Sequence, residues 1–256
     1  GLGTPTIRVT GVSALSGCTY RIIPDRIEAA TLVMAGAITR GRIDVTGAEP
    51  THLTAVLELL REIGVGLEYA EATIQVDGAT VLRSAECVAL PYPAVPTDVQ
   101  AQLTALLATA DGISLVTDKV FPDRFMHISE LARMGARIRR EGASAIVSGP
   151  ARLSGASVMA SDLRASAALV LAALAAEGPS VVRRIYHLDR GYERLEEKLR
   201  GLGADVTRVE DVPRNVPQEL SDCRSASTDA DISGVPTAIP APHFGGTAVR
   251  TETAQR

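Results

Sequence analysis

The chain has 256 residues, of which 46% are apolar, and this is enough for one large or two small domains with packed cores. Its formal net charge of −4 argues against non-specific nucleic-acid binding, which needs an excess of basic residues. Because no apolar run reaches about 18 residues, we predict no membrane-spanning helix.

The cysteines and histidines give no sign of a metal site or a disulfide framework. Cys18, Cys87 and Cys223 lie far apart, so we interpret them as reduced thiols of a cytoplasmic protein. The four histidines show no i, i+4 pairing, and no dinucleotide or phosphate-loop fingerprint occurs, so we predict neither a metal nor a cofactor. The chain starts Gly-Leu-Gly-Thr, without an initiator methionine or a leader, and we expect an internal piece of a longer protein.

One unit repeats three times along the chain. Gly64, Gly135 and Gly203 each follow a leucine by four residues and precede an apolar residue by three, and they are 71 and 68 residues apart. A second glycine pattern closes an earlier apolar helix in each unit and has similar spacing. Glycine just past a helical pattern is typical of a left-handed helix cap, so both marks indicate the ends of helices.

The predicted elements follow the same order in each unit. In the first unit we expect a helix over residues 27–39, a strand over 42–45, a helix over 53–63, and a hairpin of 66–69 with 72–76. The second unit runs through 99–110, 113–117, 128–134, 136–140 and 145–147, and the third through 165–176, 180–184, 191–202 and 205–209. This is an α/β pattern, and we predict that the first helix of each unit packs inside, with the sheets outside.

Two segments lie outside the repeats. Residues 3–12 are predicted to form a strand that ends a preceding domain, so that 1–22 is a remnant strand and linker and 23–210 is the repeat domain. Residues 211–256 are rich in Pro, Ser, Thr, Gly and Ala with little periodicity, and we predict a disordered tail.

Acidic residues open the first helix of every unit, namely Asp25, Asp98 and Asp162. As structural residues, Asp25 fits an N-cap, and Thr97 with Gln100 fits a capping box. Each of these aspartates would stabilise its helix by about 0.3–1 kcal/mol through the helix dipole alone.

Arginines stand beside aspartates at four element boundaries. Because boundaries at one end of a repeated unit tend to converge, these arginines could form a cluster for bidentate capture of a phosphate or carboxylate. The alternative is that each is a surface ion pair of little energetic weight. The arginines concerned are Arg26, Arg124, Arg164 and Arg190, the last expected at the positive end of a helix.

Five segments together resemble the UDP-N-acetylglucosamine 1-carboxyvinyltransferase family of enolpyruvyl transferases. The resemblance covers residues 4–210, about the carboxyl-terminal half of such an enzyme. The segments are IPDRIE (23–28), PTDVQAQ (96–102), FPDRFMH (121–127), VMASDLRASA (158–167) and RIYHLDRGY (184–192).

The resemblance implies an inverse α/β barrel domain, the enolpyruvyl transferase fold, built from three βαβαββ units. It also implies a reaction in which the sugar 3′-hydroxyl adds to C2 of phosphoenolpyruvate and phosphate then leaves, the first committed step of peptidoglycan synthesis. The expected partners are the two small-molecule substrates and the missing amino-terminal half, with no nucleic acid and no membrane.

Matching the motifs residue by residue also implies roles for the site residues. Asp98 matches the carboxylate at the 3′-hydroxyl, a general base, whereas the general acid lies outside this chain. The residues implied to line the UDP-sugar pocket are Thr97, Val120 and Phe121; those near phosphoenolpyruvate are Arg124, Asp162, Leu163, Arg164 and Arg190, and Arg26 is a further candidate for substrate binding.

Two other functions stay open at this point. One is a 3-phosphoshikimate 1-carboxyvinyltransferase, which shares the repeats but not these segments. The other is a non-catalytic paralogue that binds a nucleotide-sugar. Because the chain carries only half of the active site that the resemblance implies, we expect it to be inactive alone.

Overall fold

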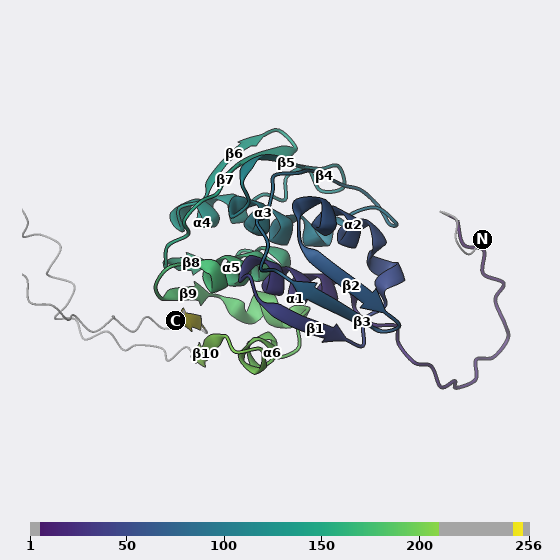
Figure 1. Ribbon diagram of the computed structural model, residues 1–256. Coiled ribbons are helices and arrows are strands. Elements are labelled where there is room, and N and C mark those ends of the chain that lie inside the picture. Colours follow the sequence, from purple (N-terminus) through teal and green to yellow (C-terminus); the bar gives the residue numbers. More distant parts are fainter. Residues whose placement is uncertain (1–5, 210–247, 253–256) are drawn as a thin grey trace, which may run out of the picture.

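The protein is described by a computed structural model that covers residues 6–209 and 248–252 (Figure 1). The first unit contains α1 (Arg26–Ile38), β1 (Arg42–Thr46), η1 (Pro50–Leu53), α2 (Thr54–Ile63), β2 (Gly66–Ala70) and β3 (Thr73–Asp77). The second contains β4 (Glu86–Ala89), η2 (Thr97–Val99), α3 (Gln100–Ala108), β5 (Gly112–Asp118), α4 (His127–Arg133), β6 (Arg137–Glu141) and β7 (Ser144–Gly149). The third contains β8 (Ser157–Met159), α5 (Leu163–Ala175), β9 (Ser180–Arg183), η3 (Ile185–Arg190), α6 (Leu195–Gly201), β10 (Asp205–Val209) and β11 (Ala248–Glu252).

Three small sheets surround three central helices, as the repeats predicted. The strand orders are β1-β3-β2, β4-β5-β7-β6 and β8-β9-β11-β10, so the units share one topology. In each sheet the last strand of the unit, β3, β7 or β11, lies between two antiparallel partners. One partner is the strand after the central helix, β1, β5 or β9, and the other is the strand after the second helix, β2, β6 or β10. In the second and third sheets a further strand, β4 or β8, lies parallel to the strand after the central helix.

The central helices α1, α3 and α5 form the core, and Figure 1 shows them inside the ring of sheets. Every residue of α3 is buried, and nine of the 13 residues of α5 are buried. A helix that is apolar on all sides belongs in an interior, and the many alanines let these helices approach closely. This confirms the predicted arrangement of helices inside and sheets outside.

The second helix of the third unit is shorter than predicted. We expected residues 191–202, but α6 begins at Leu195, because the preceding residues form η3 and a turn. A Cβ atom built on Gly191 would lie 2.8 Å from the side chain of Leu163 in α5. This close approach ties the turn to the central helix, and Arg194 has a left-handed backbone with a φ of 45°.

The terminal segments differ from the repeat domain. Residues 6–25 contain no strand and Ile7 and Val9 are exposed, but the strand expected over 3–12 is assigned to a preceding domain, so it stays a prediction. A strand needs a partner for its backbone groups, and none of the described strands lies beside residues 6–12. The disordered tail is wrong for 248–252, since these residues form β11 between β9 and β10, and the rest of the tail lies outside the described residues.

No helix within the two described ranges is long and apolar enough to cross a bilayer. In the same ranges, no group of His, Cys, Asp and Glu side chains is arranged to hold a metal ion.

Candidate functional site

Three helix N-termini converge at one rim of the molecule. The Asp25 carboxylate caps α1 by accepting from the backbone N–H of Ile27 at 2.7 Å, and the Asp162 carboxylate caps α5 by accepting from that of Arg164 at 2.7 Å. The predicted Asp25 cap and the helix-start position of Asp162 are therefore confirmed. α3 is continued at its N-terminus by η2, whose second residue is Asp98. Unpaired backbone N–H groups and aligned peptide dipoles make such a rim favourable for anions.

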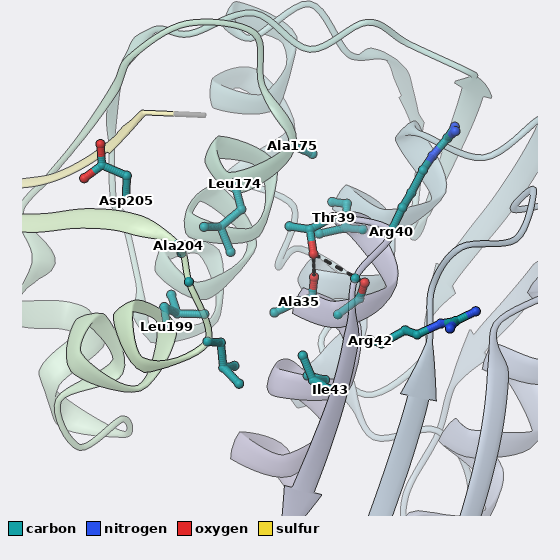
Figure 2. A pocket seen from close by; sticks show the side chains of 15 residues that line it. Ala35, Thr39, Arg40, Arg42, Ile43, Leu174, Ala175, Leu199, Ala204 and Asp205 are labelled. Atoms are coloured by element: carbon teal, nitrogen blue, oxygen red, sulfur yellow. Dashed lines mark hydrogen bonds between the residues drawn. The ribbon is translucent and has the colours of Figure 1, made fainter. Parts of the chain in front are cut away.

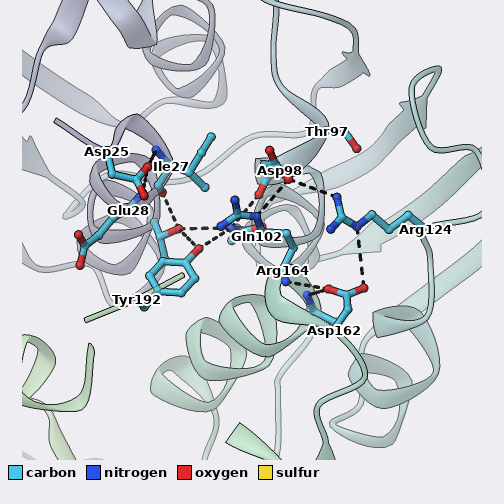
Figure 3. A network of polar contacts seen from close by, with 12 residues as sticks. Asp25, Ile27, Glu28, Thr97, Asp98, Gln102, Arg124, Asp162, Arg164 and Tyr192 are labelled. Atoms are coloured by element: carbon cyan, nitrogen blue, oxygen red, sulfur yellow. Dashed lines mark hydrogen bonds and ion pairs between the residues drawn. The ribbon is translucent and has the colours of Figure 1, made fainter. Parts of the chain in front are cut away.

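Asp98 lies between two arginines from different segments (Figure 3). Its Oδ1 accepts from Nη1 of Arg124 at 3.2 Å and from Nε of Arg164 at 3.1 Å. Nε of Arg124 is also 3.9 Å from Oδ2 of Asp162, which joins the second unit to the third. Among the described residues, Oδ2 of Asp98 has no hydrogen-bond partner. The structure thus brings together four predicted site residues: Asp98, Arg124, Asp162 and Arg164.

Asp118, at the end of β5, organises the other side of the rim. Its buried carboxylate accepts from the hydroxyl of Thr97 at 2.6 Å and from the backbone N–H groups of Val120 at 2.9 Å and Phe121 at 2.8 Å. The predicted capping box between Thr97 and Gln100 is therefore wrong, because Asp118 takes the hydroxyl instead. The result is a fixed turn that sets the Phe121 ring 5.5 Å from the Arg124 guanidinium carbon.

A buried polar network below Arg164 links all three units. The hydroxyl of Tyr192 lies 2.9 Å from that of Thr31 in α1, and the amide of Gln102 in α3 donates to it at 3.1 Å. The same amide nitrogen donates to the carbonyl of Asp98 at 3.1 Å. Arg164 lies over the Tyr192 ring at 6.0 Å. Burial is the main reason why the pKa of Tyr192 is raised, so the phenol stays neutral and can donate a hydrogen bond.

The other two predicted arginines make no direct contact with Asp98. The guanidinium carbon of Arg26 lies 5.1 Å from the ring of Tyr92, in the loop that leads to η2. Its buried Nε has no hydrogen-bond partner among the described residues. Arg190 is exposed at the end of η3, five residues before α6, so it does not stand at the N-terminus of that helix as expected. Its backbone is anchored near the rim, because Gly191 packs on Leu163.

Two of the predicted acid–base pairs have partners elsewhere. Asp123 pairs with Arg140 of β6 at 2.7 Å, and Asp189 pairs with Arg208 of β10 at 2.5 Å. Neither aspartate therefore pairs with the arginine beside it in the sequence, and both of these pairs are exposed or half-exposed.

A hollow of about 620 Å³ opens over the cluster. Its lining carries three carboxylates, the guanidinium group of Arg124 and the exposed Phe121 ring, which can hold a ligand with both an anionic group and a hydroxyl. Beneath it, burial lowers the pKa of His127 to about 4, so this imidazole is neutral at pH 7. The lining residues are Asp98, Phe121, Pro122, Asp123, Arg124, Met126 and Asp162.

Sequence reasoning missed Asp118, Gln102 and Tyr192. Two of them stand inside the quoted segments PTDVQAQ and RIYHLDRGY, and a polar residue in an otherwise apolar helix is the signal that points to Gln102. For Asp118 the only signal is an aspartate at the end of an apolar strand, a position that turn residues also occupy.

Comparisons with known proteins identify the family of this chain. The family model described as EPSP synthase (3-phosphoshikimate 1-carboxyvinyltransferase) matches residues 2–199. Among curated proteins, the UDP-N-acetylglucosamine 1-carboxyvinyltransferase of Solibacter usitatus is 52% identical over 211 residues, covering 82% of this chain and 50% of the relative. That of Koribacter versatilis is 51% identical over 209 residues, covering 82% and 48%. The chain thus spans about half the length of the curated relatives it matches.

Solved structures show the same fold. The enolpyruvyl transferase NikO from Streptomyces tendae aligns with a TM-score of 0.67 and 33% identity, over 72% of this chain and 44% of that chain. EPSP synthase from Acinetobacter baumannii aligns with a TM-score of 0.60 at 20% identity, over 93% and 47%, which shows the fold alone. With three repeated units, a shared sheet topology and a family model that matches most of its length, this chain belongs to the EPSP synthase family of enolpyruvyl transferases.

Proposed function

We propose that this chain forms half of an enolpyruvyl transferase that acts on UDP-N-acetylglucosamine and phosphoenolpyruvate. The observation that carries the proposal is the position of Asp98, whose Oδ1 is held by two arginines while Oδ2 has no hydrogen-bond partner among the described residues and the side chain lines the hollow. Relatives at about 50% identity that are named for this activity support the choice of substrate.

In the proposed reaction Asp98 accepts the proton of the sugar 3′-hydroxyl as the hydroxyl oxygen bonds to C2 of phosphoenolpyruvate. The methylene carbon takes a proton from an acid outside this chain. Phosphate then leaves as the C2–O(phosphate) bond breaks, while the new methyl group gives a proton back to the group outside this chain, and the restored C2–C3 double bond is that of the enol ether. A base must lie within hydrogen-bond reach of the proton it takes, and Oδ2, which accepts no hydrogen bond from the described residues, offers that acceptor.

Arg124 and Arg164 serve the anionic groups of phosphoenolpyruvate in this scheme. Their guanidinium donors now rest on the Asp98 carboxylate, and a phosphate or carboxylate ligand at the helix N-termini would take some of these donors. Binding of phosphoenolpyruvate would thus release the Asp98 carboxylate, which then accepts the proton of the sugar hydroxyl. Thr97, Val120 and Phe121, which Asp118 fixes, are proposed to line the UDP-sugar side.

Calorimetric titration of the 256-residue chain tests the substrate. We expect saturable binding of UDP-N-acetylglucosamine and none of shikimate 3-phosphate. The opposite preference would establish the shikimate enzyme instead, and binding of neither ligand would remove the proposed sugar site. With both substrates present we expect no phosphate release from the chain alone, because the acid lies elsewhere.

The role of Asp98 is tested in a protein restored to the full length of its relatives. Asp98→Asn is expected to leave sugar binding nearly intact and to lower turnover at least ~100-fold, as loss of a general base does. Asp111→Asn, an exposed aspartate just beyond the other end of α3, is the matched control and should turn over normally. Normal turnover by Asp98→Asn would refute the assignment.

A further inference from the structure

An arginine of β6 holds the segment that carries Arg124. Nη2 of Arg140 donates to the carboxylate of Asp123 at 2.7 Å and to the carbonyl of Pro122 at 3.2 Å. Its guanidinium carbon also lies 5.5 Å from the centre of the Phe125 ring. One side chain from a different element therefore contacts residues on both sides of Arg124 in the sequence.

Arg140 is itself held by the turn that follows its strand. Its Nε donates to the carbonyl of Gly142 at 3.0 Å. The next carbonyl of this turn, that of Ala143, accepts from the backbone N–H of Asp118 at 2.9 Å. The carboxylate of Asp118 fixes the start of the segment that carries Arg124. The turn after β6 thus anchors this segment at two places, once through Asp118 and once through Arg140.

The third unit repeats this arrangement around Arg190. Nη2 of Arg208 in β10 donates to the carboxylate of Asp189, which directly precedes Arg190 in the sequence. Nη1 of the same guanidinium donates to the buried carboxylate of Glu196 in α6 at 2.9 Å. The segment that carries Arg190 is therefore tied to a strand and, through the arginine of that strand, to a helix.

The strand that carries Arg208 is fixed against α6. The backbone N–H of Ala204 donates to the carbonyl of Leu199 at 3.0 Å, and Figure 2 shows these two residues side by side at the edge of a hollow of about 570 Å³. Nε of Arg200, in the same helix, donates to the carbonyl of Val206 at 3.1 Å. Arg208 therefore extends from a strand whose position is set by backbone contacts.

The two strand arginines occupy the same position of the repeat. Arg140 and Arg208 each stand five residues after the glycine that follows the second helix of their unit, Gly135 or Gly203. In the first unit this position is Tyr69, and the connection between β1 and α2 contains no arginine. The strand arginine thus occurs in the two units that have an Asp-Arg pair before the second helix, which indicates a common role.

This role concerns position more than stability. An ion pair between exposed groups contributes little to the free energy of unfolding, and the side chain of Asp123 is 98% exposed. A guanidinium group, however, is planar and bonds two acceptors at once in a fixed geometry. Arg140 joins a carboxylate and a carbonyl, and Arg208 joins two carboxylates. Such contacts restrict the directions in which the attached segment can point.

We propose that Arg140 and Arg208 are positioning residues, which hold Arg124 and Arg190 where the anionic groups of phosphoenolpyruvate bind. They act through the two segments and do not touch the ligand. A segment released from its strand spends part of its time with its arginine turned away, so the apparent dissociation constant rises by the inverse of the competent fraction. The inference rests on the proposed function for the identity of the anion.

Two substitutions at each position separate geometry from charge. Arg140→Gln and Arg208→Gln remove both the charge and the planar guanidinium, whereas Arg140→Lys and Arg208→Lys keep the charge and lose the two-acceptor geometry. Arg139→Gln is the matched control, because Arg139 is the neighbouring residue of β6, its side chain is 72% exposed, and it pairs with Glu141.

Hydrogen exchange in the 256-residue chain tests the hold on the segments without any substrate. The amides of Arg124 and Gly191 each donate to a carbonyl three residues earlier, at 3.0 and 3.1 Å. We expect exchange at least ~5-fold faster at the Arg124 amide in both Arg140 variants and at the Gly191 amide in both Arg208 variants. Each pair of variants should leave the other amide unchanged, and Arg139→Gln should change neither.

Steady-state kinetics of a protein restored to the full length of its relatives test the consequence for binding. With UDP-N-acetylglucosamine saturating, all four variants should raise KM for phosphoenolpyruvate at least ~5-fold and change kcat less than ~2-fold, as the loss of uniform binding does. KM for the sugar should change less than ~2-fold, because Asp118 holds the sugar side of the rim separately. Arg139→Gln should behave as the unmodified protein.

Unchanged exchange at both amides would overturn the inference whatever the activity. Faster exchange with an unchanged KM for phosphoenolpyruvate would also overturn it, because the arginines would then only support the fold. Normal KM values in the lysine variants would assign the effect to charge, and an equal rise in KM for both substrates would exclude a specific hold on the anion-binding arginines. If the unmodified full-length protein turns over neither substrate, the proposed function fails, and the exchange rates alone decide whether the two arginines hold the segments.

Discussion

The buried Asp118 carboxylate is predicted to be a main structural support of the site. Replacing it by Ala or by Asn should separate the loss of its hydrogen bonds from the loss of its charge. Asp118→Ala removes an acceptor from three donors, namely the Thr97 hydroxyl and the N–H groups of Val120 and Phe121. A hydrogen bond to a charged group contributes about 1.5–3 kcal/mol, and the two N–H groups are part-buried, so each is taken at the lower end, while the Thr97 hydroxyl can rotate to another acceptor. We therefore expect a loss of about 3 kcal/mol in the free energy of unfolding.

Asp118→Asn provides the contrast, because its amide oxygen keeps both backbone hydrogen bonds and its NH₂ group can donate to Thr97. It should cost about 1 kcal/mol, which leaves a difference of about 2 kcal/mol between the two variants. Urea unfolding at pH 7, with the slope held common, measures both. Asp77→Ala, at an exposed aspartate that also ends a strand, serves as the control and should change the midpoint least. If the Ala and Asn variants of Asp118 unfold at the same urea concentration, the support does not come from these hydrogen bonds.

Two further predictions concern buried groups below the rim. Because the pKa of His127 is about 4 in the fold and 6.5 in the unfolded chain, only the unfolded state binds its proton between these values. The full contribution of His127 to the free energy of unfolding should therefore be present above pH 6.5, and up to about 3 kcal/mol should be lost as the pH drops to 4. Urea titrations at several pH values should show that His127→Gln weakens this pH dependence. An unchanged pH dependence would contradict the burial of a neutral imidazole. Tyr192→Phe should lower the free energy of unfolding by about 1 kcal/mol, because Thr31 and Gln102 lose their shared partner, and thermal melts that show no loss in this variant would exclude the network as a stabilising link.

The periodic parts of the fold were predictable because local chemistry determines them. Gly64, Gly135 and Gly203 mark helix ends in the sequence, and the structure gives them φ values of 105°, 94° and 95°. Only glycine adopts this backbone conformation at low cost, so the residue type alone reveals the turn. The caps at Asp25 and Asp162 have the same local origin.

The features that sequence reasoning missed depend on contacts between distant segments. Asp118 accepts a hydrogen bond from Thr97 although the two residues are 21 positions apart, so no local pattern shows that the Thr97 hydroxyl already has a partner. We predicted Arg190 at a helix N-terminus because it precedes an amphipathic pattern, but Gly191 packs on Leu163 and the helix begins only at Leu195. β11 escaped notice because a five-residue strand in a polar segment is recognisable only beside its partners.

The route by which β11 reaches its sheet has a consequence for folding. In the first two units two residues connect the paired strands, β2 with β3 and β6 with β7, whereas residues 210–247, 38 in all, separate β10 from β11. The third sheet therefore depends on a contact much more distant in the sequence than the first two sheets do, and it is the last to be completed as the polypeptide emerges from the ribosome. Until residue 252 has been synthesised, β9 and β10 are unfinished edges that need protection from other chains.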